Sequence, residues 1–469
     1  MTSVLPGRLC WNGLCSLKML LSEVANHVNG ELSGKDIEIS SVSIDTRTLV
    51  EGDLYIAIRG QVFDGHVFIN KAEKAGASAV LVETEVDTKL PQIRVKDSHK
   101  ALAELAAAWK NKAKVKTIAV TGSNGKTTVK EMIAAILEIN ASVLFTKGNL
   151  NNDIGVPLTL LKLNRQHQYA VIEMGANHAG EIEYSSHYTQ PDVAVISNVG
   201  AAHIEGFGSL EGVARAKGEI IQSLSNEGVS ILNRDDEFYK LWLEISEDRK
   251  VVSFGLNETA DIKAEDIICG LQNKQFVTRF KLKTINEEIE IQLKLAGQHN
   301  VLNALAAAAS CMQMGIGLQQ IKQGLEKVRP VTGRLQPLIG EQGSLVIDDT
   351  YNANPASVKV ALDILLQCEG EPWVVLGALG EMGVDSLEIH KELGELIKSM
   401  NVVRLLTIGS DAESTSNIFG RGATFFNSQQ ALITALKQEI NGKENILIKG
   451  SRAQKMENVV AALVTDFRK

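Results

Sequence analysis

The chain has 469 residues, of which 44% are hydrophobic and 22% charged, the balance of an ordinary globular protein. This composition excludes a chain that is disordered throughout, and the length corresponds to about three domains of roughly 150 residues. A formal net charge of -8, without long runs of Lys or Arg, argues against a general binder of nucleic acids or anionic membranes. No run reaches the roughly 18 apolar residues that a transmembrane helix needs, so no membrane insertion is expected.

The N-terminal segment does not have the pattern of a signal peptide, because Trp11, Asn12 and Gly13 interrupt its apolar stretch. We therefore expect a cytoplasmic protein in which residues 1–18 form a flexible leader. The five cysteines are odd in number and scattered along the chain. This distribution indicates free thiols and favours neither a disulfide framework nor a zinc site.

The first region, residues 19–114, alternates short β-rich runs with Gly and Asp turns, which predicts a small mixed α/β domain. Its strands are expected at 42–47, 53–58 and 79–82, and a helix is expected at 98–110. A lysine-rich stretch at 110–116 follows this helix and is interpreted as a solvated boundary.

The second region, residues 115–328, opens with an apolar strand at 117–121 that leads directly into Gly122-Ser-Asn-Gly-Lys-Thr-Thr128. Apolar residues then recur at helical spacing, so the glycine-rich loop lies between a strand and a helix. Later strands alternate with helical patterns, which indicates a mostly parallel sheet covered by helices. They are expected at 169–173, 193–198, 229–232 and 251–254, before a β-rich stretch at 276–295 and an Ala-rich helix at 299–314.

The third region, residues 329–469, begins near Pro330, where a helix should end. Strands alternate with helices in a pattern typical of a compact Rossmann-like α/β domain. The strands are expected at 345–348, 373–376, 404–408 and 445–448, and the helices at 355–367, 386–399, 428–439 and 453–466. The predicted fold is therefore α/β with three domains: a small mixed domain, a central P-loop domain with a parallel sheet, and a Rossmann-like domain.

The loop at residues 122–128 has the features of a phosphate-binding loop. Its glycines let backbone N–H groups approach phosphate oxygens, and the N-terminus of the following helix favours anions. Lys126 adds positive charge and Thr127 can ligate magnesium. Only two residues separate the two glycines, where the standard motif has four. ATP is the expected ligand, whereas hydrolysis, kinase chemistry and ligation all remain open.

Polar residues follow two predicted strands near this loop. Glu173 ends an apolar run, and because burying an unpaired carboxylate is costly, either Mg²⁺ or a structural ion pair is expected there. Asn198 ends the next predicted strand, and His203 follows shortly after it. His203 could equally be a hydrogen-bonded structural histidine and Lys217 a surface lysine, so these two gain importance only as members of the whole set.

Six motifs occur in the order seen in the Mur ligases, and the resemblance covers residues 19–469. They are Thr-Gly-Ser-Asn-Gly-Lys-Thr-Thr at 121–128, Glu-Met-Gly-Ala-Asn at 173–177, Asn-Val-Gly-Ala-Ala-His at 198–203, Ala-Lys-Gly-Glu at 216–219, Gly-Gln-His-Asn-Val-Leu-Asn-Ala at 297–304 and Gly-Arg at 333–334. Mur ligases are ATP-dependent amide ligases of peptidoglycan precursor synthesis. The resemblance implies that residues 19–114 form a UDP-substrate-binding domain, residues 115–328 an ATP-binding domain and residues 329–469 a ligase domain.

Four further segments resemble the family members that add D-alanyl-D-alanine to UDP-N-acetylmuramoyl-tripeptide. They are Ile-Asp-Thr-Arg at 44–47, Phe-Asp-Gly-His at 63–66, Gly-Asn-Leu-Asn-Asn-Asp-Ile-Gly-Val-Pro at 148–157 and Ile-Asp-Asp-Thr-Tyr-Asn-Ala-Asn-Pro at 347–355. The Asp-Asn-Pro-Arg motif that is typical of the members adding diaminopimelate is absent from the sequence. The implied reaction transfers the γ-phosphoryl group of ATP to the substrate carboxylate, and the dipeptide amine then attacks the acyl phosphate.

The resemblance also implies roles for individual residues. Lys126, His203 and Lys217 would be catalytic, with Lys217 carbamylated, and Mg²⁺ would be held by Thr127, Glu173, His203 and Lys217. The ATP contacts would be Gly122, Ser123, Asn124, Gly125, Lys126, Thr127, Thr128, His299, Asn300, Asn303, Arg334 and Asp349. The substrate contacts would be Ser43, Asp45, Thr46, Arg47, Asn149, Asn152, Asn352, Lys449, Ser451 and Arg452.

Ordinary structural explanations compete at several of these positions. Asp45 and Arg47 could form a surface network, and the residues assigned to ATP could cap a helix, bridge domains or end a strand. Residues 449–452 are expected to open the last helix and to grip an anionic group. Because the ATP contacts come from two domains, a hinge near 329–333 that closes on ligand binding is expected.

Two alternative functions remain at this point. Folylpolyglutamate synthase and cyanophycin synthetase share the loop and the acyl-phosphate chemistry, but the first lacks a uridine-nucleotide domain of this kind and the second is much longer. A P-loop switch protein is suggested by Asn233-Arg-Asp-Asp236, which faintly resembles a guanine-binding motif but has Arg where Lys is expected. The sequence leaves open whether the acceptor peptide carries lysine or diaminopimelate, and a monomer is expected.

Overall fold

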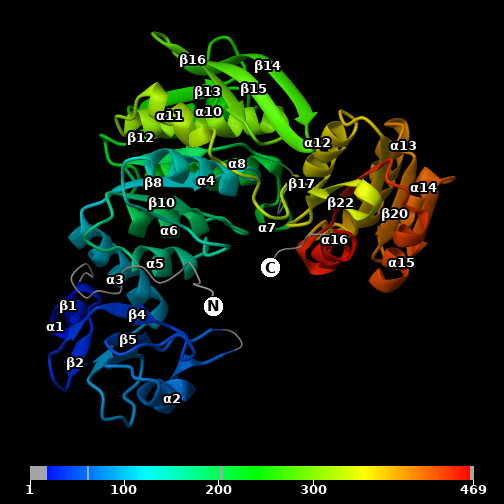
Figure 1. The fold of residues 1–469 in the computed structure, drawn as a ribbon. Coiled ribbons are helices and arrows are strands. Elements are labelled where there is room, and N and C mark those ends of the chain that lie inside the picture. Colours follow the sequence, from blue (N-terminus) through cyan, green and yellow to red (C-terminus); the bar gives the residue numbers. More distant parts are fainter. Residues whose placement is uncertain (1–17, 61–62, 201–203, 465–469) are drawn as a thin grey trace, which may run out of the picture.

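The computed structural model describes residues 18–60, 63–200 and 204–464, and it consists of three α/β units that follow one another along the chain (Figure 1). The first unit lies at one end of the molecule, the largest unit is central, and the C-terminal unit lies beside the central one. This arrangement confirms the predicted fold class. Residues 1–17, most of the predicted leader, lie outside the described residues, and no helix of the described part could cross a membrane.

The first unit is built on a five-stranded sheet in the order β2-β7-β6-β5-β4, parallel except for the β2–β7 pair. Its elements are β1 (Met19–Leu20), α1 (Leu21–His27), β2 (Glu31–Ser33), β3 (Glu38–Ile39), β4 (Ser41–Ser43), β5 (Asp53–Ile56), η1 (Gly65–Phe68), α2 (Ile69–Lys74), β6 (Ala79–Val82) and β7 (Gln92–Arg94). The strand predicted at 42–47 ends early, at Ser43. The Asp45 carboxylate accepts the backbone N–H of Arg47 and turns the chain there.

Helix α3 (Ser98–Ala113) joins the first unit to the central one. The Asp97 carboxylate accepts the backbone N–H of Lys100 and caps its start, and Lys114 in the left-handed region ends it. Trp109, buried on this helix, donates its indole N–H to the Leu163 carbonyl at 3.0 Å. One hydrophobic core therefore runs from the first unit through α3 to one face of the central sheet.

The central sheet has the order β16-β15-β14-β13-β12-β11-β8-β10-β9 and is parallel from β9 to β14. Its strands are β8 (Lys116–Thr121), β9 (Val143–Phe145), β10 (Tyr169–Glu173), β11 (Val193–Ile196), β12 (Val229–Asn233), β13 (Lys250–Gly255), β14 (Ile262–Gln272), β15 (Gln275–Lys283) and β16 (Glu288–Leu293). The stretch predicted to be β-rich at 276–295 is a pair of antiparallel strands, β15 and β16. The parallel sheet brings the carboxyl ends of β8, β10 and β11 to one edge.

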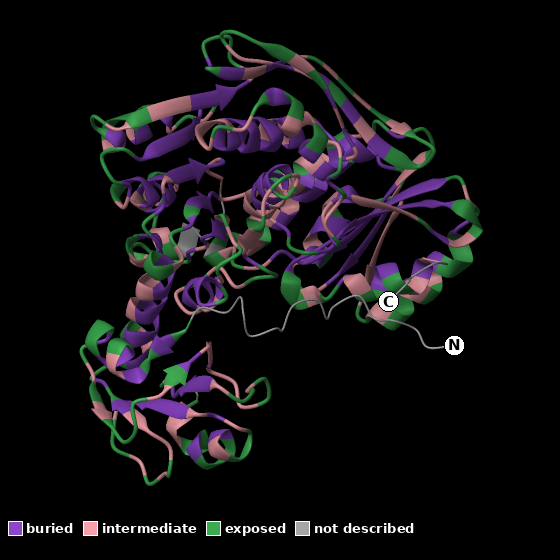
Figure 2. Ribbon diagram, turned by 60° about the vertical axis from the view of Figure 1, so that its left-hand side comes forward, coloured by how far each residue is buried: buried purple, intermediate pink, exposed green. Residues whose placement is uncertain are grey.

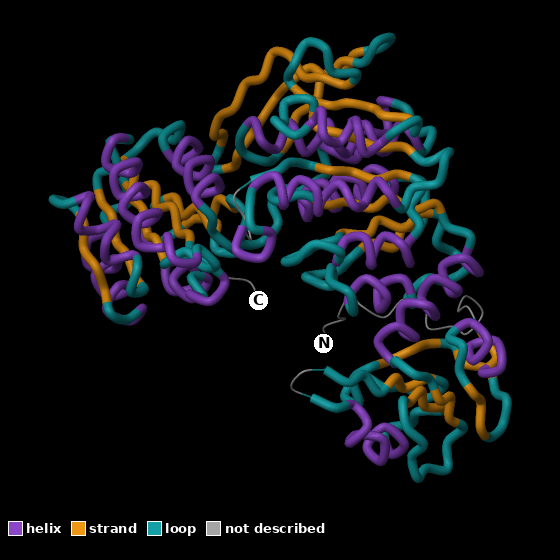
Figure 3. The backbone as a smooth tube through the Cα atoms, turned by 180° about the vertical axis from the view of Figure 1, so that it is seen from behind, coloured by secondary structure: helices purple, strands orange, loops and turns teal. Residues whose placement is uncertain are grey.

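Helices cover both faces of this sheet, as Figure 3 shows from behind. One face carries α4 (Lys126–Leu137), α10 (Gln298–Gln313) and α11 (Leu318–Leu325). The other carries α5 (Gly155–Leu160), α6 (Glu181–Thr189), α8 (Leu210–Gln222) and α9 (Tyr239–Ser246), and the short α7 (Ile204–Phe207) precedes α8. The strands between these layers are largely buried, purple in Figure 2, because both faces of a parallel sheet are covered.

The C-terminal unit has a six-stranded sheet in the order β17-β18-β22-β19-β20-β21, with only the β17–β18 pair antiparallel. Its elements are β17 (Gln336–Ile339), η2 (Glu341–Gly343), β18 (Leu345–Asp349), α12 (Pro355–Leu365), β19 (Glu371–Gly377), η3 (Gly383–Asp385), α13 (Ser386–Ser399), β20 (Arg404–Ile408), α14 (Ala412–Phe419), β21 (Ala423–Phe426), α15 (Gln429–Glu439), β22 (Glu444–Lys449), η4 (Arg452–Gln454) and α16 (Glu457–Leu463). Helices α12 to α14 pack on one face, and α15 and α16 pack on the other.

The prediction that residues 449–452 open the last helix is wrong. Lys449 ends β22, a 3-10 turn follows at Arg452–Gln454, and α16 begins only at Glu457. The turn ends at Lys455, whose left-handed backbone (φ 49°) breaks the helical path before α16 starts.

Candidate active site

The glycine-rich loop connects β8 to α4, as the sequence predicts, and its two glycines are required by close contacts. Gly122 has a φ of +144°, and a Cβ there would lie 2.0 Å from the Ser197 hydroxyl oxygen. Gly125 has a φ of +81°, and its Cβ would lie 2.4 Å from the Asn303 amide oxygen. Any larger residue would push the loop away from its neighbours, so both positions require glycine.

The end of β11 holds this loop in shape. Asn198 accepts the backbone N–H of Ser123 on its carbonyl and that of Asn124 on its side-chain oxygen, each at 2.9 Å. In return, Ser197 Oγ and Asn198 Nδ2 donate to the Asn124 carbonyl at 2.6 and 3.1 Å. The loop is therefore preorganised by side chains from a neighbouring strand rather than by its own sequence alone.

Lys126, the first residue of α4, folds back over the loop. Its ammonium donates to the carbonyls of Gly122 and Ser123 at 2.5 and 3.2 Å. Withdrawal from water lowers the pKa of this ammonium, whereas Glu173 acts in the opposite direction and Arg334 lowers it further. A positive charge thus stands among the loop amides, an arrangement suited to phosphate oxygens.

Glu173, the last residue of β10, has one free carboxylate oxygen although only 3% of the residue is exposed. Its Oε1 accepts the amide of Asn151 at 2.9 Å, whereas Oε2 is buried and accepts no hydrogen bond. An unsatisfied buried oxygen of this kind fits a divalent cation. Among the residues that the structure describes, no three His, Cys, Asp or Glu side chains gather as a metal site.

Lys217 is buried on α8 with an exposed fraction of 2%, so the alternative of a surface lysine is wrong. Burial lowers the pKa of Lys217 to about 7, the Lys126 ammonium acts in the same direction, and Glu219 and Glu181 oppose them. The amine is thus largely uncharged just above neutral pH, which is the form that reacts with electrophiles. His203, the fourth predicted metal ligand, lies outside the described residues.

The C-terminal unit contributes two side chains directly to the loop. Arg334 donates to the Thr127 hydroxyl at 3.2 Å and stacks on the Tyr351 ring, with its guanidinium carbon 4.2 Å from the ring centre. Its Nε is buried and has no hydrogen-bond partner. Asn354, which the sequence did not predict, donates to the Asn124 side-chain oxygen at 3.1 Å. Residues more than 200 positions apart in the chain therefore meet at this loop.

Three of the predicted ATP contacts, His299, Asn300 and Asn303, lie at the start of α10, where the two asparagines form a buried chain of hydrogen bonds. Asn303 donates to Asn300 Oδ1 at 3.0 Å, and Asn300 donates to the Ala296 carbonyl at 2.8 Å. Burial lowers the pKa of His299 to about 4, so this imidazole is neutral at physiological pH. Asp349 opposes that shift from β18 of the C-terminal unit. The structure brings His299 and Asp349 together across the two units.

Three of the predicted substrate residues in the C-terminal unit pair within the protein. Lys449 forms a buried ion pair with Asp349 and donates to the Asn352 carbonyl at 3.0 Å. Ser451 donates to the Ala378 carbonyl at 2.7 Å, and Arg452 is exposed and pairs with Glu457 at 3.1 Å. The side chain of Asn352, which lies after β18, accepts the backbone N–H of the next residue, Ala353, at 2.9 Å. None of these pairings tests a role in substrate binding.

In the first unit, the competing surface network is present. Arg47 Nη2 lies 2.7 Å from Asp45 Oδ2, and hydrogen bonds from Arg47 lower the pKa of the Asp45 carboxyl to about 2. Ser43 accepts the backbone N–H of Asp45 at 3.1 Å, and Thr46 lies half-buried in the same turn. This turn is preorganised, with an arginine exposed at its edge.

The asparagine-rich loop before α5 meets the site through a residue that the sequence did not single out. Asn149 is exposed, and Asn152 accepts the backbone N–H of Gly155 at 2.8 Å. Asn151, between them, holds the Glu173 carboxylate. No sequence signal distinguishes Asn151 from its two neighbours, because the contact depends on how this loop folds against β10.

The suggested guanine-binding motif at residues 233–236 is occupied by structural hydrogen bonds. Asn233 donates to the Ser197 carbonyl at 3.0 Å, Asp235 accepts the backbone N–H groups of Leu256 and Asn257, and Asp236 accepts that of Val199 at 2.8 Å. These side chains hold the loops beside β11 and β12. Their contacts argue against a role in reading a base.

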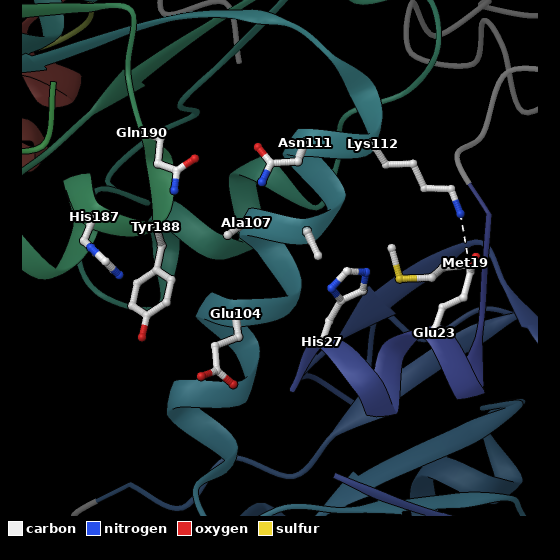
Figure 4. Close-up of a pocket in the computed structure, with 11 residues that line it drawn as sticks. Met19, Glu23, His27, Glu104, Ala107, Asn111, Lys112, His187, Tyr188 and Gln190 are labelled. Atoms are coloured by element: carbon white, nitrogen blue, oxygen red, sulfur yellow. Dashed lines mark hydrogen bonds and ion pairs between the residues drawn. The ribbon is translucent and has the colours of Figure 1, made fainter. Parts of the chain in front are cut away.

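A cavity of about 500 Å³ lies elsewhere, between α1, α3 and the C-terminal end of α6 (Figure 4). Glu104 and Asn111 of α3 line its middle, between His27 on one side and Tyr188 on the other. None of the predicted site residues lines it. The candidate active site is therefore identified from the polar side chains that converge on the glycine-rich loop, and not from this cavity.

The fold and this convergence agree with comparisons to known families. Residues 38–110 match the family description "Mur ligase family, catalytic domain", residues 120–311 match "Mur ligase middle domain" and residues 333–452 match "Mur ligase, glutamate ligase domain". The chain belongs to the Mur ligase family.

Individual relatives are similar over almost the whole chain. The UDP-N-acetylmuramoyl-tripeptide–D-alanyl-D-alanine ligase of Escherichia coli K12 is 43% identical over 450 residues, which cover 95% of this chain and 98% of the relative. A crystal structure of MurF from Acinetobacter baumannii is 35% identical, with a TM-score of 0.89 and coverage of 95% and 98%. A crystal structure of MurF from Thermotoga maritima in complex with ADP is 28% identical, with a TM-score of 0.79 and coverage of 90% and 96%.

Proposed function

We propose that this chain is an ATP-dependent ligase that joins D-alanyl-D-alanine to UDP-N-acetylmuramoyl-tripeptide and forms ADP and phosphate. The observation that carries the proposal is the 43% identity, over 95% of the chain, to a relative with that name. The phosphate-type loop, with side chains from two units around it, supports the nucleotide part. The likeness to a MurF structure in complex with ADP supports it independently.

The chain's own residues account for the first chemical step. Lys126 and the loop amides would bind the β- and γ-phosphates, and Arg334 would stand beside the transferring phosphoryl group. Transfer to the substrate carboxylate gives an acyl phosphate, which the amine of D-alanyl-D-alanine attacks with loss of phosphate. Charge stabilisation by fixed cations supplies most of the catalysis in reactions of this type. Closure at residues 329–333 would exclude water from the acyl phosphate.

A magnesium ion fits the residues present. The free, buried Oε2 of Glu173 and the hydroxyl of Thr127 are hard oxygen donors of the type that Mg²⁺ prefers. His203 would complete the set. When bound, the ion would neutralise charge that develops on the phosphates.

We also propose that Lys217 is carbamylated by carbon dioxide. Carbamylation requires an uncharged amine, and burial lowers the pKa of Lys217 to about 7. The reaction forms an N–C bond between Nζ and the carbon of carbon dioxide and releases one proton. The product carries an anionic oxygen that can face a metal ion, whereas an ammonium would repel it. This modification would explain how a lysine can occupy a cation site.

The substrates would be held by residues from all three units. The turn formed by Ser43, Asp45, Thr46 and Arg47, together with Asn149 and Asn152, would bind the UDP-containing substrate. Asn352, Lys449, Ser451 and Arg452 would bind the dipeptide or the acyl phosphate. Activity as a monomer in the cytoplasm remains a prediction from the sequence.

Phosphate release tests the proposed function directly. Purified protein is incubated with ATP and Mg²⁺, with UDP-N-acetylmuramoyl-tripeptide, and with or without D-alanyl-D-alanine, and the nucleotide product is weighed by mass spectrometry. Release that needs both substrates, with a mass gain equal to the dipeptide minus water, would support the ligase. Release that is independent of both would support a P-loop switch protein, and activity only with glutamate and a folate would support a folylpolyglutamate synthase. Parallel reactions with lysine and diaminopimelate tripeptides would identify the acceptor.

A further inference from the structure

A second lysine on α4, four residues after Lys126, is buried and has no role in the proposed chemistry so far. Only 1% of Lys130 is exposed, and lysines are rarely buried this deeply unless they are paired. Burial of an ammonium is costly, so a buried lysine at the middle of a helix needs strong partners. Its partners indicate what it does.

Lys130 binds the segment that supports the end of β10. Its ammonium donates to the Thr146 carbonyl at 2.8 Å and forms an ion pair with Glu131 Oε1 at 2.8 Å. Thr146 in turn accepts the backbone N–H of Glu173 on its hydroxyl at 2.9 Å. One side chain therefore connects the phosphate-loop helix to the backbone of the predicted metal ligand.

The distance from Lys130 to the free oxygen of Glu173 is the informative quantity. Lys130 Nζ lies 3.9 Å from Glu173 Oε2, which is too long for a hydrogen bond but short for two opposite charges. Asn151 already holds the other oxygen, Oε1. The lysine thus lies beside the carboxylate without occupying the lone pairs of Oε2.

We propose that Lys130 is a positioning residue: by holding Thr146 against the end of β10 it keeps Glu173 fixed, so that Oε2 is free to bind a divalent cation beside the ATP phosphates. The inference deepens the proposed function, because it concerns the metal of that site. Glu131, paired with Lys130, balances the lysine charge that would otherwise oppose the metal. Removing the hydrogen bond from Lys130 to Thr146 should therefore weaken metal binding more than it weakens nucleotide binding.

The test uses Mn²⁺ and ADP as probes with the full-length chain. Free Mn²⁺ is measured by electron paramagnetic resonance during titration in the presence of ADP, and ADP binding without metal is measured by calorimetry. Lys130→Met removes the ammonium that donates to Thr146, and Lys130→Gln replaces it with an uncharged donor on a side chain one bond shorter. Lys130→Arg restores the charge. Lys110→Met is the matched control. Lys110 lies on α3, away from the candidate site, and is also a buried lysine that donates to a backbone carbonyl, that of Gln190.

Both neutral variants are expected to raise the Mn²⁺ concentration for half-saturation about tenfold, as found for supporting residues of metal sites. Their metal-free ADP affinity should change less than about twofold, Lys130→Arg should recover part of the loss, and Lys110→Met should bind Mn²⁺ normally. If Lys130→Met does not fold, Lys130→Gln decides the question. Unchanged Mn²⁺ binding in a folded neutral variant would overturn the inference, as would the absence of ADP-dependent Mn²⁺ binding in the unaltered chain.

The Mn²⁺ measurement also separates this inference from the proposed function. One outcome is that Mn²⁺ binding depends on Lys130 while the unaltered protein forms no dipeptide adduct. It would contradict the proposed substrates and leave the role of Lys130 intact. The opposite outcome is that the unaltered protein forms the dipeptide adduct while substitution of Lys130 leaves Mn²⁺ binding unchanged. It would support the proposed function and contradict the role of Lys130.

Discussion

The strand ends of the central sheet and those of the first sheet carry similar polar residues, but the protein treats them differently. At the central edge, Glu173 is buried and one of its oxygens has no hydrogen-bond partner. At the first edge, Asp45 and Arg47 face solvent and satisfy each other. Because a buried polar atom without a partner is costly, the central edge is suited to binding a cation, whereas the polar groups of the first edge already satisfy each other.

Electrostatics separates the two regions in the same way. Burial and a neighbouring ammonium lower the pKa of Lys217 to about 7, whereas local hydrogen bonds from an exposed arginine lower the pKa of Asp45 to about 2. Shifts produced by burial in a converging site are the better indication of function, since a surface ion pair also shifts a pKa without any chemistry. The effects of substitutions should therefore decrease from the central edge to the first edge.

Loss of Lys126 should have the largest effect. Lys126→Ala removes the cation that lies over the loop carbonyls, and we expect kcat/KM to fall about 1000-fold or more, because fixed charges at a transferring phosphoryl group supply most of the rate. Steady-state phosphate release measures this, with circular dichroism to verify the fold. Lys126→Arg keeps the charge and should remain impaired, because the larger guanidinium does not fit the same pair of carbonyls. A loss below about tenfold in Lys126→Ala would contradict the assignment of this loop.

Loss of Lys217 should come next. Lys217→Ala removes the proposed carbamate, and activity should fall roughly 100-fold and be partly restored by millimolar acetate, whose carboxylate replaces the missing oxygen ligand. Lys240→Ala, at an exposed lysine of α9, is the control and should leave activity unchanged.

The pH profile sharpens the same prediction. Because the pKa of Lys217 is about 7, its amine is mostly protonated below that pH and cannot react with carbon dioxide. Unmodified protein prepared without carbon dioxide should therefore gain activity on adding bicarbonate at pH 8 and gain much less at pH 6. Equal gains at both pH values, or a gain in Lys217→Ala, would contradict carbamylation.

An intermediate effect is expected at Arg334, which reaches the loop from the other unit. Arg334→Ala removes its bond to Thr127 and its stacking on Tyr351, and kcat/KM should fall roughly 10- to 100-fold with little change in folding. Tyr351→Phe keeps an aromatic ring under the guanidinium and should be close to the unaltered protein. X-ray scattering with and without nucleotide would test closure, since Arg334→Ala should reduce any ligand-induced compaction.

Sequence patterns predicted the fold best where the apolar pattern is unambiguous. The limits of β6, β10, β20 and α13 agree with the prediction to the residue, because the three strands are short, nearly continuous apolar runs and the helix buries a single face. Strand β14 was missed, since it lies in a ribbon whose alternating residues include many charges. Helix α14 was missed because its Ser- and Thr-rich sequence has low helix propensity, and packing against α13 supplies its stability.

The residues of the candidate site also fall into those that the sequence predicted and those that it did not. The glycine loop could be predicted because it follows a recognisable strand, Glu173 because it ends one, and Lys217 and Arg334 because they lie in family motifs. The roles of Asn151, Lys130 and Asn354 could not, although Asn151 and Asn354 lie in segments that resemble the family, because their contacts depend on long-range folding: Asn354 meets Asn124 across 230 positions of sequence. Local pattern identifies residues that must be polar, but only the tertiary structure tells which partners they meet.

The smallest effect is expected at Arg47, and it tests whether the first edge is more than a surface pair. Arg47→Ala frees the Asp45 carboxylate, so the pKa of that carboxyl should return toward its ordinary value, which NMR titration can follow. If Arg47 also binds the UDP part of the substrate, the KM for that substrate should rise about three- to tenfold while kcat stays unchanged, because binding is lost equally from ground and transition states.

This rise in KM should be smaller at high salt, since screening weakens the attraction between an exposed arginine and a pyrophosphate. Arg215→Ala, at an exposed arginine of α8 that pairs with Glu211, is the matched control and should leave this KM unaltered. An Arg47→Ala variant with an unchanged KM would leave the turn as a self-contained surface pair and confine the binding determinants to the half-buried and buried groups around the loop.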